Sequence, residues 1–449
     1  MNSNTFDFER YPTLTESGRR ILEFMREHPA APFFRNQSGN RLSASEVNEL
    51  REYEIDIRSS KIGWREHGFP EWLQDFVHRT FESVPFYRRL GSPPIRFEDI
   101  PPVGRSDLAK DIADFVPDHI EVDRMINFRT TGTTGHPLLI ASHPVVAGRY
   151  LAFHKRAMDR FGVQLTYGAG QVGVVLLGFQ RTCFTYVSVT PSMEESGLAK
   201  INLHPDDWRH PEDRAKYLDA MAPEVIAGDP ISLSELTRIP LQHKPRVILS
   251  VSMMLLPGLR QRLEVQFNCP VLDIYSLNEV GPVAVFDPLV GGHVLLQPNL
   301  YVEILDDNGT PLPPGQRGEI VVTGGFNFCL PLVRYRTGDF ASLTHHSEGP
   351  VLIGLSGRSP VRYRLPNGDW INNIDVTHAL KSLALPHFRL HQDNNGRVCL
   401  FLSPSGMAYA KEAIAQLKCL FQGETIELKE LIVEDKAIQY TSDLIGASS

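Results

Sequence analysis

The 449-residue sequence has few cysteines, and their positions would not hold a metal or a framework of disulfides. The five are an odd number, they are widely separated, and no Cys-x-x-Cys pair occurs. The lack of a closely spaced pair argues against a structural zinc site, and an odd, scattered set of cysteines argues against a disulfide framework. Reduced thiols in a cytoplasmic protein are the simplest interpretation of Cys183, Cys269, Cys329, Cys399 and Cys419.

The sequence also lacks long apolar runs and blocks of one charge. No window approaches the roughly 18 apolar residues of a membrane-spanning helix, and the amino-terminal residues contain no apolar signal core. The net charge is −8, the pI is near 6.1, and no basic cluster of the kind that binds nucleic acid occurs. A composition of 42% hydrophobic and 22% charged residues predicts a soluble globular protein with neither nucleic acid nor membrane as partner.

The chain is longer than one hydrophobic core usually serves, which predicts two or more domains. From about residue 170, short apolar runs alternate with helical stretches, a pattern typical of βα units and a parallel sheet. From residue 293, Asp-Asn-Gly and Pro-Pro-Gly turns separate strand-like runs and indicate antiparallel hairpins. We predict an α/β fold with a large N-terminal domain over 1–357, which combines parallel βα layers with an antiparallel β subdomain. A small α+β C-terminal domain follows over 358–449.

Three helices are predicted in the amino-terminal part of the chain. The stretch "SASEVNELREYEIDIRSS" is predicted to be helical, with Ser45 as the expected N-cap. A second helix includes apolar residues at helical spacing from Phe69 to Phe81, and Pro85 is expected to end it. A further capped helix is expected in "VGRSDLAKDIADFV".

The stretch Arg129–Pro137, "RTTGTTGHP", contains four threonines and two glycines but no lysine. Glycine lets backbone N–H groups approach an anion, so the stretch can form a phosphate cradle. The Walker-type cradle has a lysine directly after its second glycine, whereas His136 follows Gly135 here. An ordinary P-loop NTPase is therefore a poor interpretation. A polar hairpin turn between the apolar segments "MINF" and "PLLIAS" is the alternative.

Three further stretches follow along the chain, each with two interpretations. In "LDIYSLNEVGP", Tyr275 can stack on a planar heterocycle, and Glu279 is either a helix-start charge or a ligand for Mg²⁺. In "LVRYRTGDF", the two arginines are expected to pair with surface acids, while Asp339 can accept hydrogen bonds from ribose hydroxyls. The last stretch, "GLSGRSP", is either an interdomain linker or part of a site.

The four stretches together resemble the motifs of the adenylate-forming enzymes, which include acyl- and aryl-CoA synthetases and adenylation domains. That family has Ser/Thr-Gly-Thr-Thr-Gly-Lys-Pro, Tyr-x-x-(Ser/Thr)-Glu, Tyr-x-Thr-Gly-Asp and Gly-Arg in this order. The chain has "TTGTTGHP", "YSLNE", "YRTGD" and "GR". The stretches "VPFYRRL", "FEDIPPVGRSDL" and "LPLVRYRTGD" resemble the phenylacetate–CoA ligase branch in particular. The resemblance extends over roughly residues 70 to 360.

The resemblance implies ATP-dependent activation of a carboxylic acid to an acyl-adenylate, with release of pyrophosphate. A mobile C-terminal lid domain then rotates, and a thiol such as that of CoA attacks. By the same resemblance Glu279 holds Mg²⁺ and takes part in catalysis with Thr131 and Lys436. The implied nucleotide-binding residues are Thr130, Thr131, Gly132, Thr133, Thr134, Gly135, Ser252, Asp273, Tyr275, Ser276, Asp339 and Arg358. A homodimer is also a family-level expectation.

The sequence departs from the family pattern at several positions. His136 replaces the loop lysine, and Pro360 stands where the family often has a hinge aspartate. Ser252-Met253-Met254 replaces a Gly-(Gly/Ala)-Glu turn beside the acyl pocket, and Asp435 replaces the glycine before Lys436. Adenylation depends mainly on positioning and on electrostatic stabilisation of phosphate oxygens, so these departures bear directly on activity.

Two functional hypotheses follow from the resemblance. The first is an AMP-forming ligase for a small, aromatic carboxylic acid, with ATP and Mg²⁺ as cofactors. Its acceptor is CoA, a carrier-protein thiol or an amine. Phe179 and Tyr186 either line the acid pocket or are ordinary core aromatics beside a buried strand. The alternative is a catalytically impaired protein that binds a nucleotide or acyl-adenylate as a sensor or assembly partner.

Overall fold

The computed structural model of the chain describes residues 8–62, 64, 68–129, 138–179, 183–347, 349–357, 361–380, 382–385, 388–431 and 439–444. These residues form two compact units built from discontinuous segments. The first unit comprises residues 1–48, 161–273 and 360–449, and the second comprises 49–160 and 274–359. The second unit ends at residue 359, and the first unit contains both ends of the chain. The division into domains 1–357 and 358–449 stays a prediction.

The first unit contains a mostly parallel sheet with strand order β7-β6-β3-β5-β4. Strand β3 pairs in parallel with β5 and β6, and β6 pairs in parallel with β7, while β4 runs antiparallel to β5. These strands are rich in valine, isoleucine and leucine and are almost wholly buried, as expected for a parallel sheet covered by helices. The prediction of βα units is confirmed. The strands are β3 (Val172–Gly178), β4 (Tyr186–Thr190), β5 (Ser196–Asn202), β6 (Val225–Gly228), β7 (Val247–Val251) and the start of β8 (Val271–Leu277).

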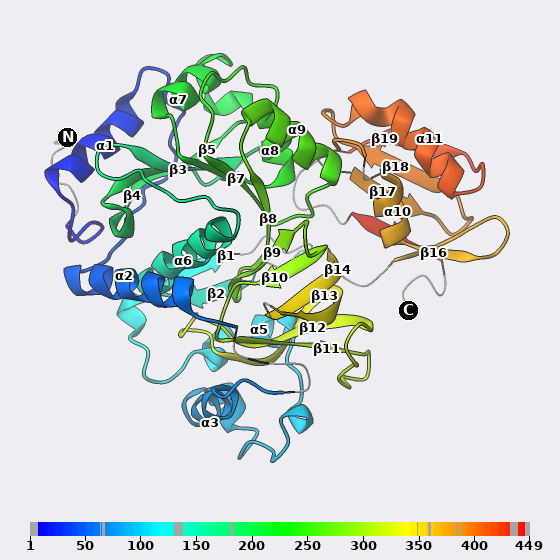
Figure 1. Cartoon of the computed structure of the whole chain (residues 1–449), viewed down its shortest axis with the longest axis horizontal. Helices are drawn as coiled ribbons and strands as arrows, with labels where there is room; N and C mark the ends of the chain where they lie inside the picture. Colours follow the sequence, from blue (N-terminus) through cyan, green and yellow to red (C-terminus); the bar gives the residue numbers. More distant parts are fainter. Residues whose placement is uncertain are drawn as a thin grey trace. The chain divides into compact units, whose positions relative to one another are not determined.

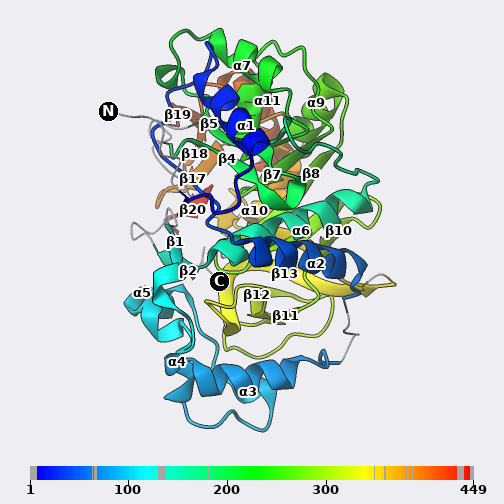
Figure 2. The same cartoon turned by 90° about the vertical axis from the view of Figure 1, so that its left-hand side faces the viewer.

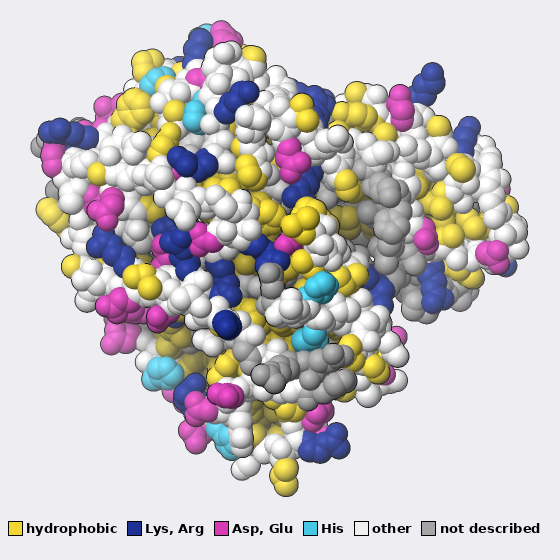
Figure 3. Space-filling model, in the orientation of Figure 1, with side chains coloured by type: hydrophobic (Ala, Val, Ile, Leu, Met, Phe, Trp, Pro, Cys, Tyr) yellow, Lys and Arg dark blue, Asp and Glu magenta, His cyan; other side chains and the backbone are white. Residues whose placement is uncertain are grey.

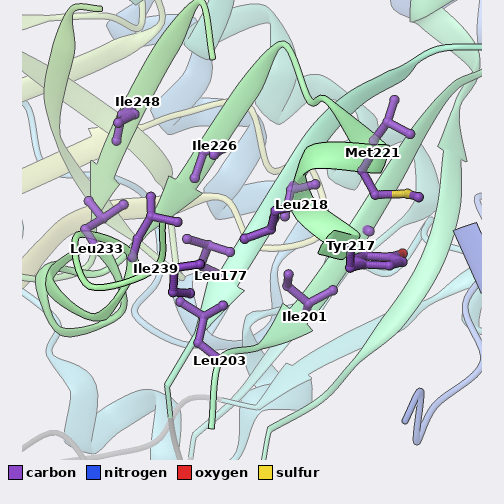
Figure 4. Packing of buried hydrophobic residues seen from close by; sticks show 14 of the residues in the cluster. Leu177, Ile201, Leu203, Tyr217, Leu218, Met221, Ile226, Leu233, Ile239 and Ile248 are labelled. Atoms are coloured by element: carbon purple, nitrogen blue, oxygen red, sulfur yellow. The ribbon is translucent and has the colours of Figure 1, made fainter. Parts of the chain in front are cut away.

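Four helices pack against these strands in one hydrophobic cluster. Figure 4 shows Leu177, Ile201 and Ile226 of the strands beside Tyr217 and Leu218 of α7. The buried hydroxyl of Tyr217 donates a hydrogen bond of 2.9 Å to the backbone oxygen of a residue in α1. The helices are α1 (Glu16–Glu27), α7 (Asp213–Met221), α8 (Pro230–Leu236) and α9 (Pro257–Phe267), and all are labelled in Figure 1.

The carboxyl-terminal part of the first unit contributes most of a second hydrophobic cluster, which Leu256 joins from the segment before α9. Its four-stranded sheet has the order β19-β18-β17-β20, with β17 antiparallel to β18 and parallel to β20. Strand β18 and helix α11 contribute buried leucines to one cluster. The predicted mixture of strands and a helix is confirmed by β15 (Arg362–Arg364), β16 (Trp370–Asn372), α10 (Asn373–Leu380), β17 (Phe388–Gln392), β18 (Val398–Leu402), α11 (Ala410–Leu420), β19 (Ile426–Glu430) and β20 (Tyr440–Ser442).

The second unit contains an antiparallel sheet with strand order β11-β12-β13-β14-β10-β9, and residues from 274 onward in β8 pair with β9. Glycines with positive φ, Gly309 at +83° and Gly315 at +81°, occupy the turns between β11 and β12. The predicted antiparallel hairpins are confirmed. The strands are β9 (Gly281–Asp287), β10 (Gly292–Leu295), β11 (Leu300–Leu305), β12 (Arg317–Gly324), β13 (Leu332–His346) and β14 (Gly349–Gly357).

Helices of the second unit cover this sheet. In both Figure 1 and Figure 2, α3 (Leu73–Ser83) lies beside β11 and β12, and its buried residues join the cluster that contains Tyr335 of β13. Pro85 does not extend α3 but begins α4 (Pro85–Arg88), which agrees with its expected role as a helix end. Helix α6 (Pro144–Arg160) packs on α2 (Ala44–Ser59), where Lys155 pairs with Glu54 at 2.6 Å.

Two details of the helix predictions are wrong. The N-cap of α2 is Ser43, whose hydroxyl accepts from the Glu46 N–H at 3.3 Å while the Glu46 carboxylate accepts from the Ser43 N–H at 2.8 Å. This reciprocal pair forms a capping box, an arrangement that Ser45 inside the first turn cannot make. The predicted helix in "VGRSDLAKDIADFV" is divided into α5 (Arg105–Lys110) and a short 3-10 turn, because the chain is extended at Asp111.

The five cysteines all lie in the described residues, and the surface carries charges of both signs. Four of the five cysteines are buried and unpaired, and Cys419 on α11 is exposed. Burial raises the pKa of the Cys269 and Cys329 thiols to about 12. On the face drawn in Figure 3, lysine and arginine side chains are interspersed with aspartate and glutamate. None of the helices in the described parts of the chain combines the length and apolarity needed to cross a bilayer.

Candidate active site

Glu279 lies in the tight turn that joins β8 to β9. The last pairs of this hairpin are Ser276 with Pro282 and Leu277 with Gly281, so Glu279 stands outside the ladder. Its side chain is 7% exposed, and its Oε1 accepts from the Tyr335 hydroxyl at 3.1 Å and from Arg105 Nη1 at 3.4 Å. The interpretation of Glu279 as a charge at a helix start is therefore wrong. It is a buried carboxylate in a turn.

Tyr275 and Asp339 are in direct contact although 64 positions separate them. The Tyr275 hydroxyl donates to Asp339 Oδ2 at 2.8 Å. Burial, followed by the Asp339 charge, raises the pKa of Tyr275 well above its ordinary value, so this hydroxyl stays a donor at neutral pH. The second and third sequence motifs therefore meet in one place.

An irregularity in β13 sets the position of Asp339. Glu319 of β12 pairs with Phe340, but Val321, only two residues on, pairs with Arg336. The residues between Arg336 and Phe340 therefore bulge from the ladder, with Gly338 at a φ of +75°. The bulge is fixed because the Thr337 hydroxyl donates to a β12 carbonyl oxygen at 2.8 Å and accepts from the Asp339 N–H at 3.1 Å. Bulges of this kind re-aim a side chain next to a binding site.

The fourth motif also begins beside Asp339. In the ladder between β13 and β14, Asp339 is paired with Gly357, which immediately precedes Arg358 in the chain. Arg358 itself lies outside the described residues. The same is true of Thr130, Thr131, Gly132, Thr133, Thr134, Gly135, His136, Pro360 and Lys436. The hairpin of β1 (Ile126–Arg129) and β2 (Leu139–Ser142) that flanks the threonine-rich loop is antiparallel, as expected for a loop between two strands.

The other predicted residues belong to the ends of neighbouring strands. Ser252 follows β7 directly and is exposed, with an uncommon φ of +71°. Asp273 and Ser276 are partly buried in β8, on either side of Tyr275. Phe179 packs against the main cluster of the first unit and contacts His204, with ring centroids 5.9 Å apart. Its role as a wall of an acid pocket stays a prediction, as does that of Tyr186.

Arg334 is not a surface group, contrary to the sequence prediction. It is 1% exposed, and its Nε donates to Glu303 Oε1 at 2.8 Å. Its Nη1 donates to the carbonyl oxygens of Glu98 and Ile100 at 2.5 and 2.7 Å. Arg336, also expected at the surface, is partly buried and pairs with Glu319. Arg334 therefore ties β11 and the segment before α5 to β13.

Sequence reasoning missed Arg105 and Tyr335 as neighbours of Glu279. Both lie in stretches quoted for the family resemblance, but neither has a local pattern that indicates a contact with Glu279. Burial and the nearby Glu279 charge raise the pKa of Tyr335 well above its ordinary value. The Tyr335 hydroxyl consequently remains protonated and donates to the carboxylate.

The carboxylate of Glu279 is the group at this place that fits a magnesium ion. Mg²⁺ takes oxygen ligands and is usually bound by one or two carboxylates together with phosphates and water. Glu279 supplies one such carboxylate, and the phosphates of a nucleotide would supply further oxygen ligands.

The conformation after Glu279 allows a matched stability test. Gly281 has a φ of +71°, and a Cβ there would lie 2.3 Å from Phe326 Cε1; Gly291 has a φ of +73° and no atom within 4 Å of the same position. Both alanine substitutions incur the backbone strain, but Gly281→Ala also overpacks the turn. We expect Gly281→Ala to destabilise the protein by about 1–3 kcal/mol more than Gly291→Ala, measured from urea unfolding midpoints. Equal midpoints would show that the turn can yield.

The chain is similar to known adenylate-forming proteins. Residues 145–328, which include Ser252, Tyr275 and Glu279, match the family model described as AMP-binding enzyme. A phenylacetate–coenzyme A ligase of Pseudomonas putida is 27% identical over 348 residues, which cover 71% of this chain and 72% of that protein. The corresponding ligase of Escherichia coli strain K12 is 25% identical over 314 residues, 63% of this chain and 68% of that protein.

A solved structure shares the fold. A 2-hydroxyisobutyryl-CoA ligase, crystallised in the postadenylation state in complex with R3-HIB-AMP, superimposes with a TM-score of 0.60. The alignment covers 83% of this chain and 88% of that one at 18% sequence identity. At this identity the similarity supports the arrangement of helices and strands and not a particular substrate.

Proposed function

We propose that the chain activates a small aromatic carboxylic acid with ATP. It belongs to the adenylate-forming enzymes, as a divergent member of their phenylacetate–CoA ligase-like branch. The chain is an AMP-forming ligase of the acyl- or aryl-CoA type. In the proposed first step, a carboxylate oxygen bonds to the α-phosphorus as the bond to pyrophosphate breaks. In the second step, the thiol of CoA attacks the acyl carbonyl, and AMP leaves.

The observation that carries the proposal is the hydrogen bond between Tyr275 and Asp339. It joins two motifs that are distant in sequence, and the pairing of Asp339 with Gly357 brings the start of a third to the same place. A random pair of polar turns would not converge in this way. The Tyr275 hydroxyl donates to the carboxylate and thereby holds it in one orientation, as a side chain that receives two ribose hydroxyls requires.

The proposed roles of the remaining residues follow from their positions. The ring of Tyr275 would stack on adenine, with Asp273 at the edge of the base and Ser276 and Ser252 as further nucleotide contacts. Glu279 would hold Mg²⁺ that arrives with the phosphates, and Thr131 and its neighbours would contact the β- and γ-phosphates. Lys436 would bridge the carboxylate and the α-phosphate. Bound Mg²⁺ supplies Lewis-acid stabilisation of phosphate charge.

The aromatic substrate is proposed from the two phenylacetate–CoA ligases that the chain resembles. Methionines at 253 and 254, after Ser252, are consistent with an apolar ligand because methionine adapts its shape to apolar surfaces. CoA is the proposed acceptor for the same reason, and a carrier-protein thiol or an amine are the alternatives.

Acid-dependent exchange between ATP and labelled pyrophosphate tests the proposal directly. We expect exchange with at least one aryl acid and weaker exchange with short acyl acids, and we expect Lys436→Ala to reduce it by about 10²-fold or more. AMP release that requires added CoA would then identify the acceptor. Exchange that survives in Lys436→Ala would remove that lysine from the mechanism. ATP binding without exchange for any acid would instead support the nucleotide-binding sensor.

A further inference from the structure

The carboxylate of Glu279 already has a cationic neighbour from its own chain. Arg105 Nη1 lies 3.4 Å from Glu279 Oε1, the same oxygen that receives the Tyr335 hydroxyl. The two side chains differ in exposure, 35% for Arg105 and 7% for Glu279. The carboxylate is therefore buried, whereas the guanidinium is partly exposed at the edge of the site.

The position of Arg105 is built into the fold of the second unit. Arg105 begins α5, and the Asp107 carboxylate fixes this start by accepting from the Gly104 N–H at 3.0 Å. Just before it, the Val103 N–H donates to the Arg334 carbonyl oxygen at 3.0 Å, and the Arg336 N–H donates to the Val103 carbonyl oxygen at 2.8 Å. These bonds attach the chain to β13 on both sides of Tyr335.

The Arg334 side chain attaches the same segment a second time, through the carbonyl oxygens of Glu98 and Ile100. The segment that delivers Arg105 is consequently held to β13 over several residues, so the approach of Arg105 to Glu279 is not the chance contact of a loose surface arginine. Most exposed ion pairs contribute little, but Glu279 is buried and the segment that carries Arg105 is held to β13.

We propose that Arg105 is a tethered counter-ion of Glu279 that competes with the magnesium ion for this carboxylate. The inference rests on the proposed function, in which Glu279 is the protein's ligand to Mg²⁺. A guanidinium beside the carboxylate neutralises it while no metal is bound, which avoids the cost of an isolated buried charge. When a metal ion arrives, the two cations repel each other at close range, and Arg105 has to withdraw.

Arg105 therefore stabilises the Glu279 carboxylate while no metal is bound. Because it has to withdraw when the metal ion arrives, it also weakens metal binding. Two unit charges a few ångströms apart interact strongly even at an effective dielectric constant near that of a protein surface. Allowing for the partial exposure of Arg105, we expect its loss to tighten metal binding by about tenfold.

Manganese binding measured by electron paramagnetic resonance tests this inference without turnover. Mn²⁺ is titrated into the full chain at a saturating concentration of α,β-methylene-ATP, which cannot be adenylated. We expect Arg105→Gln to raise the Mn²⁺ affinity by about tenfold and Arg105→Lys, which keeps the charge, to remain within about twofold of the unmodified protein. Arg105→Met is a second charge-free variant that retains the apolar stem.

Arg89→Gln is the matched control. Arg89 belongs to the same unit and pairs with Asp114 at 2.6 Å, so its substitution changes the net charge equally at an exposed site. We expect no change in Mn²⁺ affinity for this control. An unchanged or lower affinity in both Arg105→Gln and Arg105→Met would overturn the inference.

Glu279→Gln separates this inference from the proposed function. A drop in Mn²⁺ affinity of about tenfold or more in Glu279→Gln supports Glu279 as the metal ligand. If that drop occurs and the charge-free Arg105 variants do not bind Mn²⁺ more tightly, only the counter-ion role fails. Mn²⁺ binding that is unaffected by Glu279→Gln would remove the metal site itself, and the inference would fall with it.

Discussion

Arg334→Met is expected to lower the free energy of unfolding by about 3–5 kcal/mol, the range for removing one partner of a buried ion pair. The substitution leaves the Glu303 carboxylate, 6% exposed, without its guanidinium, and it removes the donor to two backbone carbonyl oxygens. It also releases the segment that carries Arg105. Urea unfolding followed by tryptophan fluorescence measures the change.

The double variant Arg334→Met/Glu303→Leu is the informative control. Replacing both partners of a buried pair by apolar groups is often nearly neutral, so we expect it to regain a large part of the loss. Arg89→Met, at an exposed pair, should have a much smaller effect. A loss for Arg334→Met no larger than that of Arg89→Met would show that Arg334 does not hold the unit together.

The loss in Arg334→Met should depend on pH through Glu303. Burial raises the pKa of this carboxyl above its ordinary value of 4.5 even with Arg334 beside it, and removing the guanidinium raises it further. A group whose pKa is raised on folding favours the folded state below its unfolded pKa, and this contribution is lost as pH rises through the folded value. The deficit of Arg334→Met is therefore expected to be smaller near pH 4.5 and larger at neutral pH.

Glu279→Gln is expected to reduce acid-dependent ATP–pyrophosphate exchange by about 10²–10³-fold, because the side chain keeps its shape but loses the charge that we propose to hold a metal ion. The amide oxygen can still accept from Tyr335, so the turn between β8 and β9 should keep its conformation. The unfolding midpoint should change little, and a large drop in stability would mean that the activity loss reports misfolding.

Tyr335→Phe is the companion to Glu279→Gln. It removes the 3.1 Å hydrogen bond to Glu279 but leaves the carboxylate charged. We expect a reduction in exchange of about tenfold, smaller than that of Glu279→Gln, since one hydrogen bond to a charged group is at stake. Excess Mg²⁺ should partly restore the rate in Tyr335→Phe and not in Glu279→Gln. Equal losses in the two variants, unaffected by Mg²⁺, would contradict a metal-binding role for Glu279.

The local features of the fold were predictable from the sequence because local patterns determine them. Short runs rich in valine and isoleucine predict the buried strands β3, β6 and β7, and the glycine-containing turns predict the antiparallel hairpins. The cap of α2 was misplaced by two residues because Ser43 and Ser45 are both good caps. Only the reciprocal bond with Glu46 distinguishes them.

Contacts between distant positions could not be predicted in the same way. The family resemblance implies that Tyr275 and Asp339 share a nucleotide site, but neither it nor any local pattern predicts the hydrogen bond between them. Arg105 meets Glu279 across 174 positions, and Arg334 is buried because three separate segments converge on it. An arginine beside a tyrosine in a strand has the same local signal whether it faces solvent or the interior, so only the folded chain distinguishes the two.

The exposure of Cys419 makes the carboxyl-terminal part of the first unit directly observable. The other four cysteines are buried, and Cys419 lies on α11, which packs in the cluster formed mainly by this part of the chain. A maleimide-linked spin label or fluorophore should consequently react at one position without any cysteine being removed. The natural chain thus offers a single-site reporter with which the predicted lid movement can be tested.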